Sequence, residues 1–94
     1  MIEFENDARW DAEQVSVLLW ATRDRERIKC LVRGEALDGQ FGSGKNEQER
    51  LAAFTDNRAM IEGRIRDKIE SGHLERDPDG LVPWQVVLLP ADLQ

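Results

Sequence analysis

A glycine-rich segment is the feature of this sequence closest to a known chemical motif. Gly39-Gln40-Phe41-Gly42-Ser43-Gly44-Lys45 matches the phosphate-binding pattern G-x-x-x-x-G-K. Asn46, however, stands where the motif needs the Ser or Thr hydroxyl that holds magnesium. The segment also follows a predicted helix instead of a buried strand. The sequence therefore predicts a glycine-rich joint with no nucleotide hydrolysis and no bound cofactor, and incidental anion binding at the next helix start stays open.

The side chains that could act as nucleophiles or metal ligands are few and far apart. Cys30 lies on an apolar strand face, and the single histidine, His73, follows the expected end of a long helix. One Cys and one His cannot make a structural zinc site, and Cys30 has no base near it in the sequence. Asp77 and Asp79 with Gly80 resemble the start of a calcium loop without its later ligands, so a plain turn is predicted. No catalytic residue and no metal site is predicted, and we expect no enzyme.

Arg58 is the residue for which the sequence predicts a specific role. It falls in the apolar stripe of the long helix, where a guanidinium must reach water or find a carboxylate. Glu35 is the first candidate partner, with Asp11 and Asp92 as alternatives. The structural hypothesis is an ion pair or hydrogen bond that fastens the helices to the sheet. The functional hypothesis is a charged anchor in a ligand or partner site.

Three tryptophans are many for a chain of 94 residues, and we expect two of them in the core. Trp20 shares a strand face with Leu18, opposite to Val17, so one face of the sheet is expected to stay partly open. Exposed aromatic side chains with a polar rim are typical of protein-binding surfaces. A homodimer through a sheet face or an edge strand is therefore one hypothesis, and an unidentified protein partner is another.

Hydrophobic periodicity predicts the strands that hold these residues. Period two over residues 15–22 and 27–33 indicates two antiparallel strands joined by a polar connection at 23–26. The first of them is apolar on both faces, which predicts a central or doubly covered position. A last strand alternates over residues 84–89 between two prolines, which favours an edge position or clean strand ends.

Two helices are predicted between these strands, a short one over residues 35–41 and a long one over residues 47–71. Asn46 and Glu49 have the capping-box spacing, and Gly72 suits the end of the long helix. Its apolar stripe is Leu51, Phe54, Ile61, Ile65 and Ile69. The predicted fold is one α+β domain over residues 1–94 in the order β-β-α-α-β. Its sheet has about three to four strands, and both helices pack mainly on one face.

Charge and composition disfavour several functions. The chain has 13 basic and 19 acidic side chains, a net charge of −6, and no continuous basic segment. This balance disfavours binding to nucleic acid or to an anionic membrane. No apolar segment approaches the length of a membrane span, and no signal peptide is visible. A single cysteine fits a reducing compartment, so the expected location is the cytoplasm.

Several short motifs follow one another along the chain. They are Trp10-Asp11, Cys30-Leu31-Val32-Arg33-Gly34-Glu35-Ala36-Leu37, Phe41-Gly42, Leu51-Ala52-Ala53-Phe54, Arg58 and Ile61-Glu62. In order and spacing they resemble the bacterial family DUF1488 (domain of unknown function 1488), most clearly over residues 10–72. The tail is longer and richer in Asp and Pro than in some short members. The resemblance implies a small cytoplasmic α+β protein of bacterial origin, and it implies no reaction, ligand or catalytic residue.

The leading hypothesis from the sequence is a non-enzymatic bacterial protein that binds another protein. It rests mostly on what the sequence lacks. The alternative is a small-molecule or anion-binding regulatory module built on Arg58, Lys45 and the glycine-rich segment. A pocket that holds Arg58 without a carboxylate partner would favour the alternative, whereas an apolar or Trp-bearing surface would favour protein binding.

Overall fold

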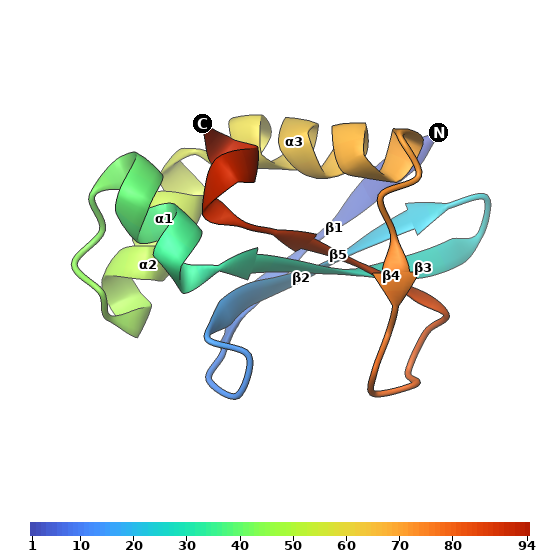
Figure 1. Cartoon of the computed structure of the whole chain (residues 1–94), viewed down its shortest axis with the longest axis horizontal. Helices are drawn as coiled ribbons and strands as arrows, with labels where there is room; N and C mark the ends of the chain where they lie inside the picture. The colour runs from blue at the N-terminus through green and yellow to red at the C-terminus, as the bar shows by residue number, and fades with distance from the viewer.

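The computed structural model, which describes residues 1–94, contains one five-stranded sheet in the order β1-β2-β3-β5-β4. Its strands are β1 (Ile2–Asp11), β2 (Ser16–Arg23), β3 (Glu26–Arg33), β4 (Glu75–Arg76) and β5 (Trp84–Leu88). The first three strands form an antiparallel meander. β5 pairs in parallel with β3, and the two-residue β4 pairs antiparallel with β5 (Figure 1). The central strands are thus β2, β3 and β5.

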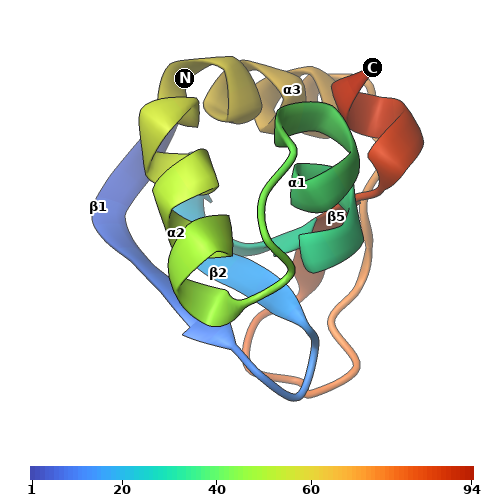
Figure 2. The same ribbon diagram turned by 90° about the vertical axis from the view of Figure 1, so that its left-hand side faces the viewer.

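All the helices lie on one face of this sheet. They are α1 (Gly34–Phe41), α2 (Glu47–Asp56), α3 (Arg58–Glu70) and the short 3-10 helix η1 (Pro90–Leu93). α3 runs over the sheet, while α1 and α2 cover one end of it (Figures 1 and 2). None of these helices is both long enough and apolar enough to cross a membrane. The sheet therefore has one helix-covered face and one face without helices.

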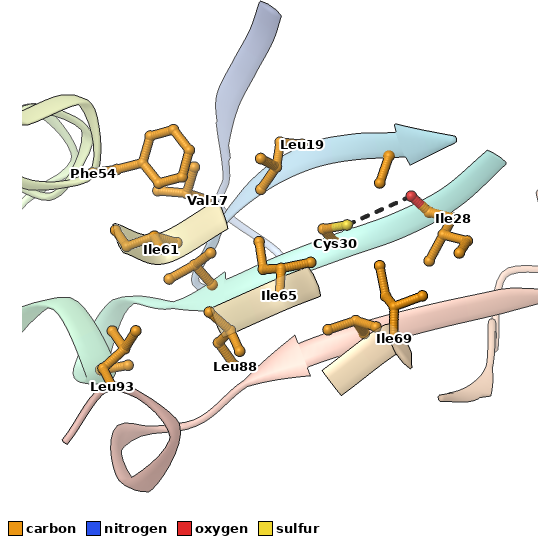
Figure 3. Packing of buried hydrophobic residues seen from close by; sticks show 14 of the residues in the cluster. Val17, Leu19, Ile28, Cys30, Phe54, Ile61, Ile65, Ile69, Leu88 and Leu93 are labelled. Carbon is orange, nitrogen blue, oxygen red and sulfur yellow. Dashed lines mark hydrogen bonds between the residues drawn. The ribbon is translucent and has the colours of Figure 1, made fainter. Parts of the chain in front are cut away.

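The core lies between the sheet and the helices. Ile61, Ile65 and Ile69 are buried at a spacing of four, which is one stripe of α3, and they face the strands (Figure 3). Val17 and Leu19 of β2 meet this layer, because alternate residues of a strand point to the same side. Burying side chains of this size contributes about 1.5–3 kcal/mol each. The predicted apolar stripe and the strand alternation are both confirmed.

The predicted fold class is confirmed, but the predicted numbers of strands and helices are wrong. The sequence indicated three to four strands and two helices, whereas the structure has five strands and three α-helices. β1, with ten residues, is not among the strands that the sequence predicts. The last strand, β5, is flanked on both sides over part of its length, so its two prolines mark strand ends and not an edge position.

The predicted long helix over residues 47–71 is interrupted at Asn57. Its φ of −121° and ψ of 21° leave the helical range, which separates α2 from α3. The side-chain amide of Asn57 donates to the carbonyl oxygen of Ala53 at 2.9 Å. A short polar side chain that bonds to the preceding turn competes with the regular backbone pattern. The apolar stripe continues across the break, which explains why periodicity alone did not reveal it.

The predicted helix ends are confirmed. The Asn46 side chain accepts the backbone N–H of Glu49 at 2.9 Å and begins α2. Gly72, with a φ of +76°, follows the end of α3, and the N–H of His73 donates to the Lys68 carbonyl at 2.9 Å. This is the Schellman arrangement, which glycine favours because it has no Cβ. His73 is therefore the helix-end residue that the sequence predicted.

The expectation of two core tryptophans is wrong. All three are half-buried, and only Trp10 packs against the core cluster. Each indole lies beneath a guanidinium group: Arg50 over Trp10, Arg27 over Trp20 and Arg76 over Trp84. Arginine covers an aromatic face well, since its weakly hydrated plane stacks on the ring. These rings consequently stay at the rim of the apolar layers.

The β2–β3 hairpin has a two-residue turn whose backbone is unfavourable for one of its residues. Asp24 and Arg25 both have positive φ values, 51° and 70°, as a type I′ turn requires. Asp tolerates this region, whereas Arg does so only at a cost. We expect Arg25→Gly to raise the free energy of unfolding by about 1 kcal/mol in urea titrations. Arg25→Ala, which keeps the strain, should give no such gain, and equal effects of the two substitutions would contradict this explanation.

Candidate functional site

The sheet face turned away from the helices is the candidate functional surface, and we call it the second face. Strand register gives its rows across the sheet as Arg9-Leu18-Leu31-Val87, Trp20-Lys29-Gln85-Glu75 and Asp11-Ser16-Arg33. Two connections extend from the sheet on this side, the turn at residues 12–15 and the loop at residues 77–83 (Figure 1). Leu18 and Leu31 are only 5% and 3% exposed although no helix covers them. Side chains of neighbouring residues therefore shield the centre of this face.

A hollow of about 240 Å³ lies on the second face over β1, β2 and β3. Its lining consists of Glu5, Asp7, Arg9, Leu18, Trp20 and Arg27. The Arg27 guanidinium is 4.2 Å from the centre of the Trp20 ring and makes two hydrogen bonds to the Glu5 carboxylate, at 2.9 and 3.1 Å. The sequence prediction that Trp20 lies on a partly open face is thus confirmed. The hollow combines an aromatic floor with charges of both signs.

A buried ion pair anchors the 77–83 loop to the second face. The Lys29 ammonium lies 2.5 Å from the Asp77 carboxylate and 3.0 Å from that of Asp79. The side chains of Lys29 and Asp77 are 5% and 0% exposed. Asp77 also accepts backbone N–H groups of Asp79, Leu81 and Val82 at 3.0–3.2 Å. The predicted turn at this place is confirmed, but the sequence did not reveal that it holds a buried lysine.

The charges of this pair are stabilised by their mutual contact. Burial by itself would raise the pKa of the Asp77 carboxyl, but the hydrogen bonds from Lys29 and from the loop backbone outweigh it and hold the pKa at about 2. Burial would likewise lower the pKa of Lys29, and Asp77 and Asp79 raise it instead. Both groups are therefore ionised over the whole neutral range.

Arg58 fastens α3 to β1, with partners other than those predicted. Its Nε donates to Glu62 at 2.7 Å, and its two terminal nitrogens donate to the backbone carbonyls of Glu5 and Asn6 at 2.6 and 3.1 Å. These carbonyls lie where β1 has two extra residues relative to β2, between Phe4 and Ala8. A bulge takes carbonyls out of the strand ladder, so Arg58 satisfies groups that β2 leaves free. The structural hypothesis for Arg58 is supported.

The predicted carboxylate partners of Arg58 all lie elsewhere. Glu35 is exposed and pairs at 3.5 Å with Arg33. Asp11 accepts the backbone N–H of Gln14 at 3.1 Å, and Asp92 pairs with Lys68 at 2.9 Å. The expected contact between Arg58 and Glu35 is therefore wrong. Contacts to backbone carbonyls cannot be predicted from residue types. The contact with Glu62 could have been predicted, because Glu62 lies four residues after Arg58 on the same helix.

A second arginine, Arg50, makes a tightly built contact that the sequence analysis missed. Its guanidinium binds both carboxylate oxygens of Asp38, at 3.0 and 2.6 Å, and lies 5.2 Å from the centre of the Trp10 ring. A Cβ at Gly34 would lie 2.8 Å from the guanidinium carbon, so a larger residue there would displace the Arg50 side chain from this position. This contact lowers the pKa of Asp38 and joins α1 to α2.

The glycine-rich segment does not form a phosphate site. Gly39 lies inside α1, and Gly42 ends that helix with a φ of 65°. The Glu49 carboxylate packs directly against Gly44, at the N-terminus of α2 where an anion would bind. An acidic group there repels a phosphate. Arg58 and Lys45 also lie at opposite ends of α2 and line no common pocket.

Cys30 is buried in the core, as the sequence predicted. Burial raises the pKa of its thiol to about 12, so almost none of it is thiolate at neutral pH. Its sulfur lies 3.6 Å from the carbonyl oxygen of Ile28 (Figure 3). The structure contains no group of three or more His, Cys, Asp or Glu side chains that could hold a metal ion.

The buried pair of Lys29 and Asp77 is expected to contribute strongly to stability. Asp77→Asn leaves the Lys29 ammonium buried beside a neutral amide, so we expect the free energy of unfolding at pH 7 to fall by about 3–5 kcal/mol. Urea titration would measure this. The exposed Asp79→Asn is the matched control and should cost about 1 kcal/mol or less.

The contribution of Asp77 to the free energy of unfolding is expected to depend on pH. Because the pKa of Asp77 is lowered on folding, its stabilising effect is complete above about pH 4 and is lost as the pH falls towards 2. The difference in unfolding free energy between the unmodified chain and Asp77→Asn should shrink over that interval. A constant difference from pH 6 to pH 2 would show that ionised Asp77 is not the source of the stability.

The contacts of Arg58 with the β1 carbonyls are expected to stabilise the fold. Arg58→Met removes the donors to two β1 carbonyls, and we expect a loss of about 1–3 kcal/mol in the free energy of unfolding. Glu62→Gln, which leaves the carbonyl contacts in place, should cost about 0.5 kcal/mol. Equal losses in the two variants would mean that the ion pair, and not the carbonyl contact, carries the stabilisation.

Comparisons with known proteins agree with the fold. A family model described as a protein of unknown function (DUF1488) matches residues 2–80. The crystal structure of a protein of unknown function from the DUF1488 family of Shewanella loihica PV-4 is similar, with a TM-score of 0.74, 24% sequence identity and 90% of each chain covered. No curated protein matches the chain. The family match and the shared fold confirm the resemblance seen in the sequence: the chain belongs to the DUF1488 family.

Proposed function

We propose that this chain is a non-enzymatic protein-interaction module that binds its partner through the second face. The proposal rests on one observation: all the helices lie on one face of the sheet, so the other face has no helix against it. β2 and β3 carry apolar side chains on both faces, and helices cover only one of them. A sheet face with an apolar centre and a polar rim is the kind of surface that proteins use for binding.

The exposed apolar side chains support this choice of surface. Three of the four large ones, Val15, Leu81 and Leu89, lie on or beside the second face and are 42%, 71% and 48% exposed. Val15 is in the β1–β2 turn and Leu81 in the 77–83 loop, the two connections that hang on this side. Strand alternation places Leu89 on the side of Val87. Most of the exposed large apolar side chains therefore lie on this side of the molecule.

The sheet edges are poorer binding surfaces than the second face. β1 is an edge strand, but its bulge and its acidic side chains hinder the addition of another strand. Arg58 already occupies two of its carbonyl groups. β4, at the other edge, is two residues long and offers too few backbone groups for pairing.

The small-molecule or anion-binding alternative has less support. Arg58 has carboxylate and carbonyl partners, and Glu49 occupies the helix start that an anion would need. A polar groove of about 190 Å³ lies at the end of α3, lined by Arg64, Asp67, Lys68, Ser71, His73 and Asp92. It has no apolar lining, and its lysine is already bound to Asp92, which is unlike a typical ligand pocket.

The proposed setting is the bacterial cytoplasm. The single thiol, Cys30, is free and buried, which suits a reducing compartment. The acidic balance of the chain, with a net charge of −6, supports a protein partner over a nucleic acid.

Affinity capture tests the proposal. Tagged protein would be incubated with extract of the source organism, and captured proteins, including the untagged chain itself, would be quantified by mass spectrometry. We expect Leu81→Lys and Trp20→Ala to reduce capture of the partner about tenfold or more, as for central interface residues. Ala52→Lys, on the exposed side of α2, is the control and should leave capture unchanged.

Other results would refute the proposal or favour the alternative. Capture that both second-face variants leave intact, or no capture by the unmodified chain, would refute binding through this face. Thermal stabilisation by inorganic phosphate that Lys45→Ala abolishes would favour the anion-binding alternative instead.

A further inference from the structure

We propose that the partner on the second face is a basic segment of another protein, and that Val15 of the β1–β2 turn is its principal apolar contact. This inference rests on the proposed function and adds the chemistry of the partner. Two independent observations support it: the backbone conformation of Val15, and the charges of the second face that have no partner within the chain.

Val15 has a backbone conformation that is unfavourable for its side chain. Its φ is 50°, in the left-handed region, where a β-branched residue is a clear outlier. Glycine or asparagine would suit this backbone better. The side chain is 42% exposed and does not belong to the core cluster. Packing in the core therefore does not account for a valine at this position.

Hydrogen bonds hold the turn in this conformation. The N–H of Gly34 donates to the Val15 carbonyl at 2.9 Å, and the Ser16 hydroxyl donates to the Gln14 carbonyl at 2.9 Å. The Arg33 guanidinium donates to the same Gln14 carbonyl at 2.6 Å. Strained backbone persists where the surrounding structure fixes it, and it is concentrated at binding and catalytic sites. The turn thus holds Val15 in place at one end of the second face.

The basic side chains of the second face are mostly engaged within the chain. Three of them form ion pairs, which are Arg27 with Glu5, Lys29 with Asp77 and Asp79, and Arg33 with Glu35. Arg9, which lines the hollow beside Trp20, has no ion pair. Little positive charge is therefore left on this face for a partner.

Several acidic side chains of this face, in contrast, have no ion-pair partner. On the strands and the β1–β2 turn they are Glu3, Asp7, Asp11, Glu13 and Glu75. Asp11 and Glu13 also line a hollow of about 410 Å³ at this turn, together with Arg9, Trp10 and Ala12. The charge that the face offers to a partner is therefore mainly negative, as is the net charge of the chain, −6.

A basic partner fits this arrangement. Lysine and arginine side chains are attracted to the unpaired carboxylates, whereas an acidic surface is repelled. Val15 lies beside these carboxylates and offers an apolar contact within a polar rim, as central interface residues do. A second copy of the chain is a poorer partner, because it brings the same acidic groups to the contact.

Fluorescence anisotropy with two synthetic peptides tests the charge of the partner. One is an amphipathic Leu/Lys peptide of about 15 residues, about 22 Å long as a helix, and the other has Glu in place of each Lys. We expect the chain to bind only the Lys peptide, with an affinity that decreases with added salt. Glu13→Lys should weaken this binding about tenfold. Glu70→Lys, which changes the net charge equally but lies on α3, is the control and should weaken it less than about twofold.

Two substitutions of Val15 separate backbone strain from contact with the partner. Val15→Asn relieves the strain, so the midpoint of urea unfolding should rise, while binding of the Lys peptide should weaken about tenfold. Val15→Thr keeps the β-branched shape and the strain, so it should not raise the midpoint, and its hydroxyl should weaken binding by a smaller factor. A gain in stability together with a loss of binding is not expected of a residue whose role is only structural.

Three results would overturn the inference. They are a chain that does not bind the Lys peptide, equal losses in Glu13→Lys and Glu70→Lys, and unchanged binding in both Val15 variants. A dimer in sedimentation velocity that Val15→Asn disrupts would also overturn it, since the occupant would then be a second copy of the chain.

Capture from extract separates this inference from the proposed function. If Leu81→Lys and Trp20→Ala reduce capture of a protein while Val15→Asn and Glu13→Lys do not, the second face binds a partner of another chemistry. The proposed function itself fails if capture is indifferent to Leu81→Lys and Trp20→Ala.

Discussion

The architecture depends on one constraint: the central strands are apolar on both faces, and the chain has helices for only one. On the helix side the isoleucines of α3 complete the core against β2 and β3. On the other side Leu18 and Leu31 are 5% and 3% exposed although no helix covers them, so side chains of neighbouring residues shield them. Such cover is thinner than a helix layer, because extended polar side chains exclude water less completely. The second face is therefore both a part of the core and the least protected apolar region of the molecule.

A buried ion pair holds the 77–83 loop to the sheet. The Lys29 ammonium and the Asp77 carboxylate are buried together, and the loop backbone supplies the remaining hydrogen bonds to Asp77. A buried charge tolerates few geometries, since any displacement leaves it without a partner. The ion pair consequently fixes the loop to Lys29 of β3, while the hollow beside Trp20 lies over β1, β2 and β3.

Local pattern accounts for what the sequence predicted, and long-range contact accounts for what it did not. Period two identified β2, β3 and β5, and single residues such as Asn46 marked helix ends, because these signals lie within a few positions. β1 has the same alternation, but its many acidic residues are uncommon in strands and its bulge interrupts the register. Trp20 was placed correctly because strand alternation alone fixes its face. The partners of Arg58 and Lys29 could not be predicted, since one binds backbone carbonyls and the other a carboxylate far along the chain.

The bulge in β1 connects the edge of the sheet to the helix layer. It frees two carbonyl groups, which Arg58 of α3 binds, and so it couples the edge of the sheet to the helix layer. An edge strand that is bent, charged and already engaged is a poor template for another strand. With β4 too short to extend the sheet at the opposite edge, neither side offers a regular backbone for pairing. Strand addition at either edge is thereby hindered, so the proposed association with another protein depends on the side chains of the second face.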